Sequence, residues 1–258
     1  MKEKTILLAG YGWFIGIPEG ETNNSEMIAN ALDGEILETT RHDGRIVRGR
    51  VHSMVMPVVW EEAFSAVQAA IKTLQPDVVV ALGTDARASA LRPEPYAVNW
   101  QRGVDAKPDH PEQQTTMNGP ILPGGKPWLR GTLPYEDMVL ASLKAGVPAQ
   151  IGSLQPPQED VPLPHTATPG LYLCNKMTYL LAAYGQSKHL PAGFIHVPTQ
   201  PAYAAKRKLE RLSQAAPETY AEELARPIAA MPLAMMIDGV RAMLTACLAA
   251  LSPDPLPK

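Results

Sequence analysis

One of the two cysteines in the sequence lies where a thiol could act as a nucleophile. Cys174 follows a glycine and a short apolar run in the segment 170–175 (GLYLCN), and a helical pattern begins at the cysteine itself. Unsatisfied amides and the dipole at a helix N-terminus favour a thiolate over a thiol. A buried structural cysteine is the commoner fate of a lone cysteine, and Cys247, inside the apolar helical pattern 243–248, fits that description. Cys174 is therefore the candidate nucleophile.

A histidine that could serve as the base ends a short predicted strand. His196 follows the residues 193–195 (GFI) and precedes Val197 and Pro198. Sheets of α/β proteins place their functional residues at the carboxyl ends of strands, where this histidine would lie. A hydrogen-bonded structural histidine would fit the same pattern. The remaining histidines are scattered and lack the spacing of metal ligands, so we expect no metal site.

A carboxylate that could orient the histidine lies at Glu94. It is flanked by Pro93 and Pro95, which restrict the backbone, and it follows a predicted buried strand at 78–82. Taken alone, Glu94 would equally fit a solvated charge in a loop. A thiol, an imidazole and a carboxylate together are the groups that carry nucleophilic acyl transfer in cysteine hydrolases.

Strand and helix patterns alternate along the chain, which predicts an α/β fold. The short apolar runs 5–9 and 78–82 are typical of buried parallel strands. Further strands are predicted at 50–59, 149–151 and 194–197, and helices at 26–32, 61–74, 136–145, 174–185 and 229–251. We therefore expect one domain over residues 1–258, a twisted and mostly parallel sheet with helices on both faces. The segments 99–133 and 152–170, rich in proline and glycine, are expected to be irregular insertions.

Composition argues against several classes of protein. The 258 residues carry a formal net charge of −3, which indicates neither a nucleic-acid partner nor a membrane-surface partner. No apolar run approaches the roughly 18 residues of a membrane span, and the run 5–9 is too short for a signal peptide. Two cysteines give no disulfide framework. We therefore expect a cytoplasmic protein with reduced thiols.

Considered together, these segments resemble the pyroglutamyl peptidase I family of cysteine peptidases, also called pyrrolidone carboxyl peptidases. The resemblance runs from the first strand to the last helix. Its segments are 9–14 (AGYGWF), 23–26 (NNSE), 32–34 (LDG), 76–80 (PDVVV) with Gly83, 94 and 97–99 (AVN), 170–175 (GLYLCN), 193–198 (GFIHVP) and 236–240 (MIDGV). All three candidate residue types occur in the family's order and in matching contexts.

The resemblance implies an activity and a set of site residues. Cys174 would be the nucleophile, His196 its base and Glu94 the group that orients the histidine. The substrate would be a peptide blocked by an N-terminal 5-oxoproline, cleaved through a thioester without a cofactor. The pyroglutamyl ring would lie against Tyr11 and Phe14 of the first turn and against Tyr172 and Leu173 beside the nucleophile. Family members commonly form dimers or tetramers, which implies a homo-oligomer here.

The sequence also departs from the family. The usual first turn resembles GFEPFGG, whereas segment 10–16 reads GYGWFIG, so Trp13 and Ile15 replace a proline and a glycine. The arginine that usually follows the catalytic glutamate is Pro95. A basic residue found further along in the family corresponds to Lys107 or to Arg102, in a loosely aligned region, and the proline-rich segment is longer. These differences leave the three catalytic types intact and concern the substrate.

Three alternatives compete with this interpretation. A dinucleotide-binding protein is suggested by Gly10, Gly12 and Gly16 after a buried strand, with Glu38 near the position of a ribose-binding acid. The third glycine is misplaced, however, and the helix cap near Ser25 comes too late for a phosphate-binding turn. The other two alternatives are a related cysteine amidase that acts on a different N-terminal cap or lactam, and a non-catalytic homologue that only binds a ligand.

Overall fold

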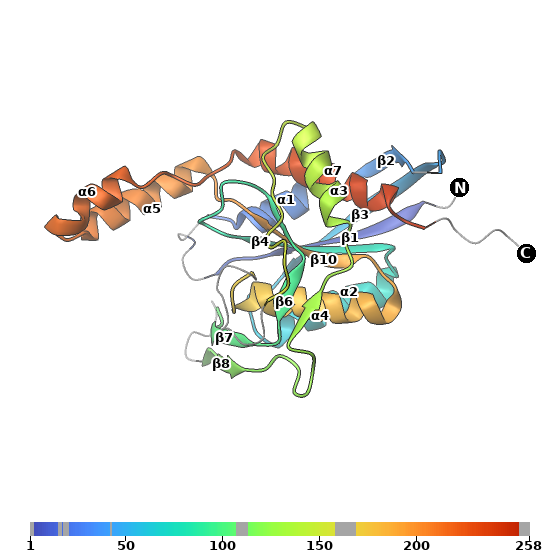
Figure 1. Ribbon diagram of the computed structural model, residues 1–258, viewed down its shortest axis with the longest axis horizontal. Helices are drawn as coiled ribbons and strands as arrows, with labels where there is room; N and C mark the ends of the chain where they lie inside the picture. Colours follow the sequence, from blue (N-terminus) through green and yellow to red (C-terminus); the bar gives the residue numbers. More distant parts are fainter. Residues whose placement is uncertain are drawn as a thin grey trace, which may run out of the picture.

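A six-stranded mixed sheet forms the centre of the molecule (Figure 1). The computed structural model describes residues 3–14, 17, 21–41, 43–106, 113–157 and 169–252. The strands lie in the order β2-β3-β1-β4-β10-β5. Their bounds are β1 Lys4–Tyr11, β2 Ile36–Thr40, β3 Ile46–Met56, β4 Val78–Thr84, β5 Arg92–Glu94 and β10 Ala192–Val197. The four inner strands are parallel, and the edge strands β2 and β5 are antiparallel to their neighbours.

Helices cover both faces of this sheet, as the sequence predicted. Along β1, Ile6 and Leu8 belong to the core beneath α1 and α7, whereas Leu7 and Ala9 belong to the core beneath α2 and α4. This alternation follows from the two-residue period of a strand buried on both sides. The helices are α1 Asn24–Leu32, α2 Glu62–Leu74, α3 Tyr135–Lys144, α4 Leu173–Lys188, α5 Pro201–Gln214, α6 Pro217–Ala225 and α7 Leu233–Ala249.

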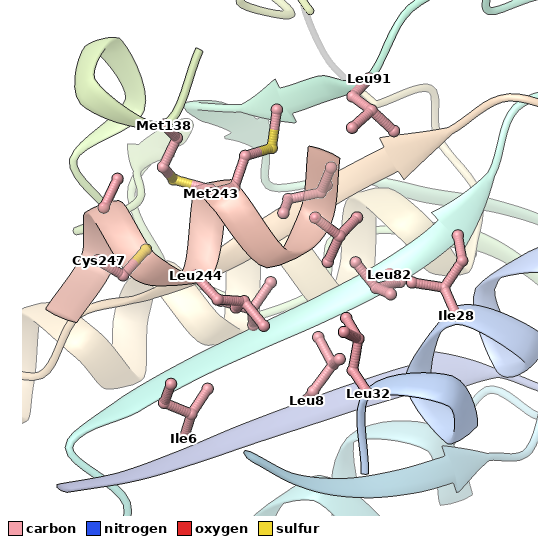
Figure 2. Packing of buried hydrophobic residues seen from close by; sticks show 14 of the residues in the cluster. Ile6, Leu8, Ile28, Leu32, Leu82, Leu91, Met138, Met243, Leu244 and Cys247 are labelled. Atoms are coloured by element: carbon pink, nitrogen blue, oxygen red, sulfur yellow. The ribbon is translucent and has the colours of Figure 1, made fainter. Parts of the chain in front are cut away.

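The larger core lies between the sheet and α1, α3 and α7. Figure 2 shows side chains from the strands and from these helices meeting in it. Its labelled members are Ile6, Leu8, Ile28, Leu32, Leu82, Leu91, Met138, Met243, Leu244 and Cys247. Cys247 is buried among these apolar groups, so its thiol acts as a core side chain. None of the described helices is long and apolar enough to cross a membrane.

Four short strands lie outside the main sheet. Strand β6, Tyr96–Val98, pairs with β9, Trp128–Arg130, and β7, Gln101–Val104, pairs with β8, Thr116–Gly119. The segment 99–133, expected to be irregular, therefore contains three of these strands; they are too short to display a clear two-residue period. The strand predicted at 149–151 forms only an isolated bridge between Leu91 and Ala149. Residues 158–168 of the second expected insertion lie outside the described residues.

A helical hairpin that the sequence patterns did not predict extends away from the sheet, at the left of Figure 1. It consists of α5 and α6, which bury one residue between them, Ala204. Lys208 of α5 donates from Nζ to the carbonyl oxygens of Leu224 and Arg226, at 2.8 and 2.7 Å, and so ties the two helices together. The hairpin buries almost no apolar surface, although Ala205, Leu209 and Leu212 of α5 stand at helical spacing; Leu209 is 66% exposed, and Leu224 of α6 is 54% exposed.

Candidate active site

A buried hydrogen bond joins His196 to Glu94. The two residues lie on the neighbouring antiparallel strands β10 and β5, where Phe194 pairs with Glu94 and His196 with Arg92. His196 Nδ1 lies 2.8 Å from Glu94 Oε1, and the two residues are only 4% and 2% exposed. The ring nitrogen must donate in this bond, because an ionised carboxylate only accepts. That leaves Nε2 of His196 for another partner.

Cys174 lies beside this imidazole. It is the second residue of α4, and a hydrogen bond with its thiol is among the interactions that raise the pKa of His196. Gly83 pairs with His196 in the sheet, and a Cβ placed on Gly83 would lie 3.1 Å from the Cys174 sulfur. A side chain at position 83 would therefore occupy the space in which the thiol and the imidazole meet. The fold thus brings together the three residues that the sequence singled out.

The electrostatic surroundings favour a protonated His196 beside an ionised Glu94. Burial by itself would lower the pKa of His196, but hydrogen bonds with Cys174 and Glu94 and the charges of both outweigh burial and raise this pKa to about 10. Burial would raise the pKa of Glu94, yet the hydrogen bond and charge of His196, together with Arg92, lower it. Each partner stabilises the charged form of the other. A protonated imidazole is the state that supports a thiolate beside it.

Two further charged residues complete the network, and the sequence analysis missed both. Arg92 donates from Nε to Glu94 Oε1 at 2.7 Å and from Nη2 to Asp85 Oδ2 at 2.8 Å. Burial opposes ionisation of Asp85, but the Arg87 amide, His196 and Arg92 lower its pKa to about 2. The signal was available: Arg92 stands two residues before Glu94, and residues at that spacing in a strand share one face.

A glycine also makes room for the carboxylate. A Cβ on Gly152 would collide with the carboxylate of Glu94, and the Gly152 amide donates to the carbonyl of Pro93 at 2.9 Å. The backbone of residue 152 therefore packs directly against Glu94 and shields it from water. Such a close approach requires glycine because any larger residue would displace the carboxylate.

The start of α4 is held against the sheet by two polar side chains. Asn175 accepts from the amide of Val98 and donates to the carbonyls of Val98 and Trp100, at 3.1, 2.9 and 2.8 Å. Tyr11 donates from its hydroxyl to the carbonyl of Leu173 at 2.9 Å. No described side chain caps the helix at Tyr172, and its first turn carries no acidic residue. The first amides of α4 are therefore available beside the Cys174 sulfur.

Comparison with known proteins identifies the family. The model of the family described as pyroglutamyl peptidase matches residues 4–249. The chain belongs to this family.

Named relatives agree with this assignment. A pyrrolidone-carboxylate peptidase of Klebsiella pneumoniae is 32% identical over 203 residues, 78% of this chain and 80% of the relative. The pyrrolidone-carboxylate peptidase of Pyrococcus furiosus is 29% identical over 76% of this chain and 81% of the relative. That of Saccharolobus islandicus is 25% identical over 92% of this chain and 91% of the relative. A crystal structure of a P. furiosus pyrrolidone carboxyl peptidase variant superposes with a TM-score of 0.71 at 24% identity. It covers 96% of this chain and 100% of that one, and it shows the shared fold.

Membership in this family of cysteine hydrolases removes the dinucleotide-binding alternative, and the structure gives its glycine pattern another explanation. A Cβ on Gly10 would collide with the backbone of Ser25, so this glycine lets α1 pack closely on β1. Glu38, the proposed ribose-binding acid, lies on the edge strand β2 and forms an ion pair with Arg48.

The four residues expected to hold a pyroglutamyl ring differ in accessibility. Tyr11 and Leu173 are 4% and 1% exposed, whereas Phe14 and Tyr172 are only partly buried. The Tyr172 ring packs edge-on against Trp60, with 5.1 Å between ring centroids, and its hydroxyl donates to the carbonyl of Val104 at 2.8 Å. Tyr11 and Leu173 are therefore almost closed to a ligand, whereas Phe14 and Tyr172 keep some exposed surface.

Of the two basic residues that the family's pattern left open, Arg102 lies among the described residues. Arg102 lies on β7 with an exposed side chain, and its amide donates to the carbonyl of Leu171 at 2.7 Å. Lys107 lies outside the described residues. Arg102 thus helps to position the segment that precedes Cys174 through its backbone.

Iodoacetamide should modify Cys174 at least about 100-fold faster than Cys247, because a thiolate is the reactive species. Cys174 lies beside a protonated imidazole, whereas burial raises the pKa of Cys247 to about 12. Peptide mapping by mass spectrometry after timed labelling measures both rates. Cys247→Ala should leave the Cys174 rate unchanged, and His196→Ala should slow it. Equal labelling of the two cysteines would contradict this assignment.

Glu94→Gln should lower the pKa of His196 from its value of about 10, because a neutral amide stabilises the imidazolium less than a carboxylate does. The imidazolium would then lose its proton at a lower pH. NMR titration of the His196 ring measures the pKa. Glu38→Gln, on the edge strand β2, is the control and should leave this titration unchanged. An unaltered His196 pKa in Glu94→Gln would refute the coupling.

Proposed function

We propose that the protein is a cysteine peptidase that removes an N-terminal pyroglutamyl residue from peptides. The observation that carries the proposal is the buried chain of contacts from Glu94 through His196 to Cys174, at the start of a helix without a side-chain cap. The residues expected to contact the pyroglutamyl ring, Tyr11, Phe14, Tyr172 and Leu173, are uncharged. Membership in the pyroglutamyl peptidase family adds support from an independent direction.

The mechanism follows from the positions of these groups. The Cys174 thiolate attacks the carbonyl carbon of the pyroglutamyl residue and forms a carbon–sulfur bond. The protonated His196 gives its Nε2 proton to the leaving amine as the carbon–nitrogen bond breaks, which leaves a thioester. Neutral His196 then takes a proton from water, whose oxygen attacks the thioester and releases pyroglutamate and the thiolate. Glu94 fixes the ring orientation throughout.

Backbone amides stabilise the oxyanion in this scheme. The amide of Cys174 belongs to the first turn of α4, where N–H groups have no carbonyl partner within the helix. Such donors stabilise the negative charge that develops on the carbonyl oxygen in the tetrahedral intermediate. The hydrogen bonds of Asn175 and Tyr11 hold this turn in place, so the donors are fixed before the substrate arrives.

The surroundings of the slot suit a neutral ring rather than an ammonium group. Tyr11, Phe14, Tyr172 and Leu173 carry no charge, and a pyroglutamyl ring requires an apolar slot with a few hydrogen bonds. The nearby Asp105 is fully buried, and its oxygens accept from the amides of Trp60 and Thr115 at 3.3 and 2.7 Å. Because this carboxylate is already occupied, we infer that a free α-amine would find no partner at the slot.

Pyroglutamyl amides should be hydrolysed, and alanyl or leucyl amides with a free amine should not. A panel of fluorogenic amides, which also includes other lactam and acyl caps, measures kcat/KM for each. Cys174→Ala and His196→Ala should abolish turnover while retaining the fold, and Glu94→Gln should keep residual activity. If a protein with a reactive Cys174 cleaves a different cap but not pyroglutamyl amides, the related-amidase alternative is correct. If it cleaves none of them, the alternative of a non-catalytic homologue gains support.

Phe14→Ala should raise KM for a pyroglutamyl amide by on the order of tenfold with a smaller change in kcat. Ring contacts present in both the ground state and the transition state contribute uniform binding, and truncation removes them. Phe14→Leu keeps an apolar contact and should fall between the wild type and the alanine variant. Steady-state kinetics on the three proteins tests this. A change in kcat alone would mean that Phe14 does not contact the ring.

A further inference from the structure

Arg92 lies between two buried carboxylates and beside the candidate base. Its Nε donates to Glu94 Oε1 at 2.7 Å, and its Nη2 donates to Asp85 Oδ2 at 2.8 Å. The same Nη2 lies 3.3 Å from His196 Nδ1. The Arg92 side chain is 21% exposed, and those of Asp85 and Glu94 are 8% and 2% exposed. Water therefore screens these charges poorly, and each acts strongly on its neighbours.

The Oε1 atom of Glu94 accepts two hydrogen bonds of nearly equal length. His196 donates to it from Nδ1 at 2.8 Å, and Arg92 donates from Nε at 2.7 Å. Arg92 thus fixes the oxygen to which the histidine is bound, and it also neutralises part of the negative charge on that oxygen. A carboxylate that already binds one cation stabilises a second cation less than a carboxylate that binds the second cation alone.

The guanidinium of Arg92 also acts on the imidazole directly. When Nδ1 of His196 carries a proton, this nitrogen and Arg92 Nη2 are both donors, so the 3.3 Å between them separates two like charges. A like charge at this distance favours the neutral imidazole, which opposes the effect of Glu94. Asp85 reduces this opposition, because it pairs with the guanidinium and its own charge interacts favourably with a protonated His196.

The other ionisable groups around His196 act differently from Arg92. Cys174 faces the ring from α4 and favours the imidazolium. Tyr11 of β1 lies beside Cys174, but burial raises the pKa of its hydroxyl well above the usual range, so it stays neutral. Arg87 binds Asp85 Oδ1 at 3.2 Å from the solvent side, where 83% of its side chain is exposed. None of these three groups places a buried cation beside the imidazole.

We propose that Arg92 is a positioning residue that fixes the Glu94 carboxylate and makes the imidazolium of His196 release its proton more readily. Asp85 holds the guanidinium in place for this role. The inference rests on the proposed function, in which the imidazolium gives its proton to the leaving amine. A general acid works best when its pKa lies near the working pH, whereas Cys174 and Glu94 raise the pKa of His196 to about 10. A buried cation beside the ring counteracts that rise and so assists the transfer.

Titration of His196 in proteins that lack the thiol tests the electrostatic part of this proposal. Every protein carries Cys174→Ala, which removes one of the groups that raise the pKa of His196 and brings the titration closer to neutral pH. Arg92→Gln should then raise this pKa by about one unit. Asp85→Asn leaves the guanidinium uncompensated and should lower the pKa. The double variant Asp85→Asn/Arg92→Gln should titrate above Asp85→Asn. NMR of the His196 ring measures each protein.

Shifts of opposite sign distinguish this role from a merely structural one. A distorted site would weaken the bond between His196 and Glu94 and would lower the pKa in both single variants. Arg87→Gln is the matched control: it removes an exposed guanidinium from the same Asp85 and should shift the pKa by less than about 0.3 units. Shifts of the same sign, or no shift in Arg92→Gln, would overturn the proposal.

The double variant keeps the test decisive if Arg92→Gln does not fold. Loss of Arg92 alone leaves two buried carboxylates short of a partner, which is strongly destabilising, whereas the double variant also removes the charge of Asp85. Its comparison with Asp85→Asn then reports the effect of the guanidinium on His196. A double variant that titrates at or below Asp85→Asn would refute the proposal.

Activity separates proton release from placement of the nucleophile. A pyroglutamyl alkylamide needs a proton on its leaving amine, whereas a pyroglutamyl p-nitrophenyl ester releases a stable phenolate. With Cys174 present, Arg92→Gln should lower kcat/KM for the amide on the order of tenfold and that for the ester by less than about twofold. Arg92→Lys keeps a cation but cannot bridge both carboxylates as a guanidinium does, so it should recover part of the loss.

Two outcomes of these assays are informative in different ways. Equal losses on the amide and the ester in Arg92→Gln would overturn the role in proton release while leaving the peptidase activity established. Absence of cleavage of both substrates by unmodified protein whose Cys174 is alkylated rapidly would refute the proposed function. The titration of His196 would still decide the electrostatic effect of Arg92, because it requires no substrate.

Discussion

The hydrogen bond between His196 and Glu94 is the interaction on which the rest of the site depends. It places a carboxylate at 2% exposure, and burial of an ionised group costs several kcal/mol unless partners compensate. Two partners do so on the same oxygen: the imidazole at 2.8 Å and the Arg92 guanidinium at 2.7 Å. Arg92 Nη2 also lies 3.3 Å from His196 Nδ1, but this is a contact between two donors when Nδ1 is protonated. Asp85 accepts a hydrogen bond from Arg92 Nη2 and so holds the guanidinium in place, while Arg92 Nε donates to Glu94.

The position of Cys174 is a separate constraint, because this candidate nucleophile lies on a helix rather than on the sheet. The sheet fixes His196 and Glu94 through the pairing of β10 with β4 and β5. Helix α4 has to approach this edge closely, and it can do so because Gly83 has no side chain. Asn175, next to the nucleophile, then holds the helix start to β6 through both its amide and its oxygen. Asn175 thus fixes the position of the adjacent Cys174 relative to the sheet.

Sequence patterns predicted the parts of the structure that depend on buried apolar runs. The strands β1, β4 and β10 and the helices α2, α3 and α4 all lie within a few residues of their predicted bounds. Edge strand β2 alternates exposed and buried residues over only five positions, too few for a recognisable two-residue period. Helix α5 has apolar residues at helical spacing, among them Ala205, Leu209 and Leu212, so the sequence pattern could have predicted it although it buries only Ala204.

The same reasoning explains which site residues were missed. Gly152 acts through a close approach to Glu94 that only the folded chain creates, since the two are far apart in sequence. Arg92 could have been found from its two-residue spacing to Glu94, but the flanking prolines favoured a loop over a strand. Tyr11 was expected in the turn after the first strand, but it is the last residue of β1, and its hydroxyl donates to the carbonyl of Leu173 at the start of α4. Roles that depend on one contact across the fold are not encoded in local patterns.

The molecule separates its catalytic network from the elements around it. Glu94, His196 and the start of α4 are held by the sheet, by buried hydrogen bonds and by glycines that tolerate no side chain. The hairpin α5–α6 contributes almost nothing to the core, and Arg207 and Arg211 of α5 line a hollow together with Arg87 and Arg226. Substitutions in the hairpin therefore cost little stability, whereas substitutions around Glu94 leave a buried charge without a partner. The hairpin can thus change in sequence while Glu94, His196 and their hydrogen-bond partners stay as they are.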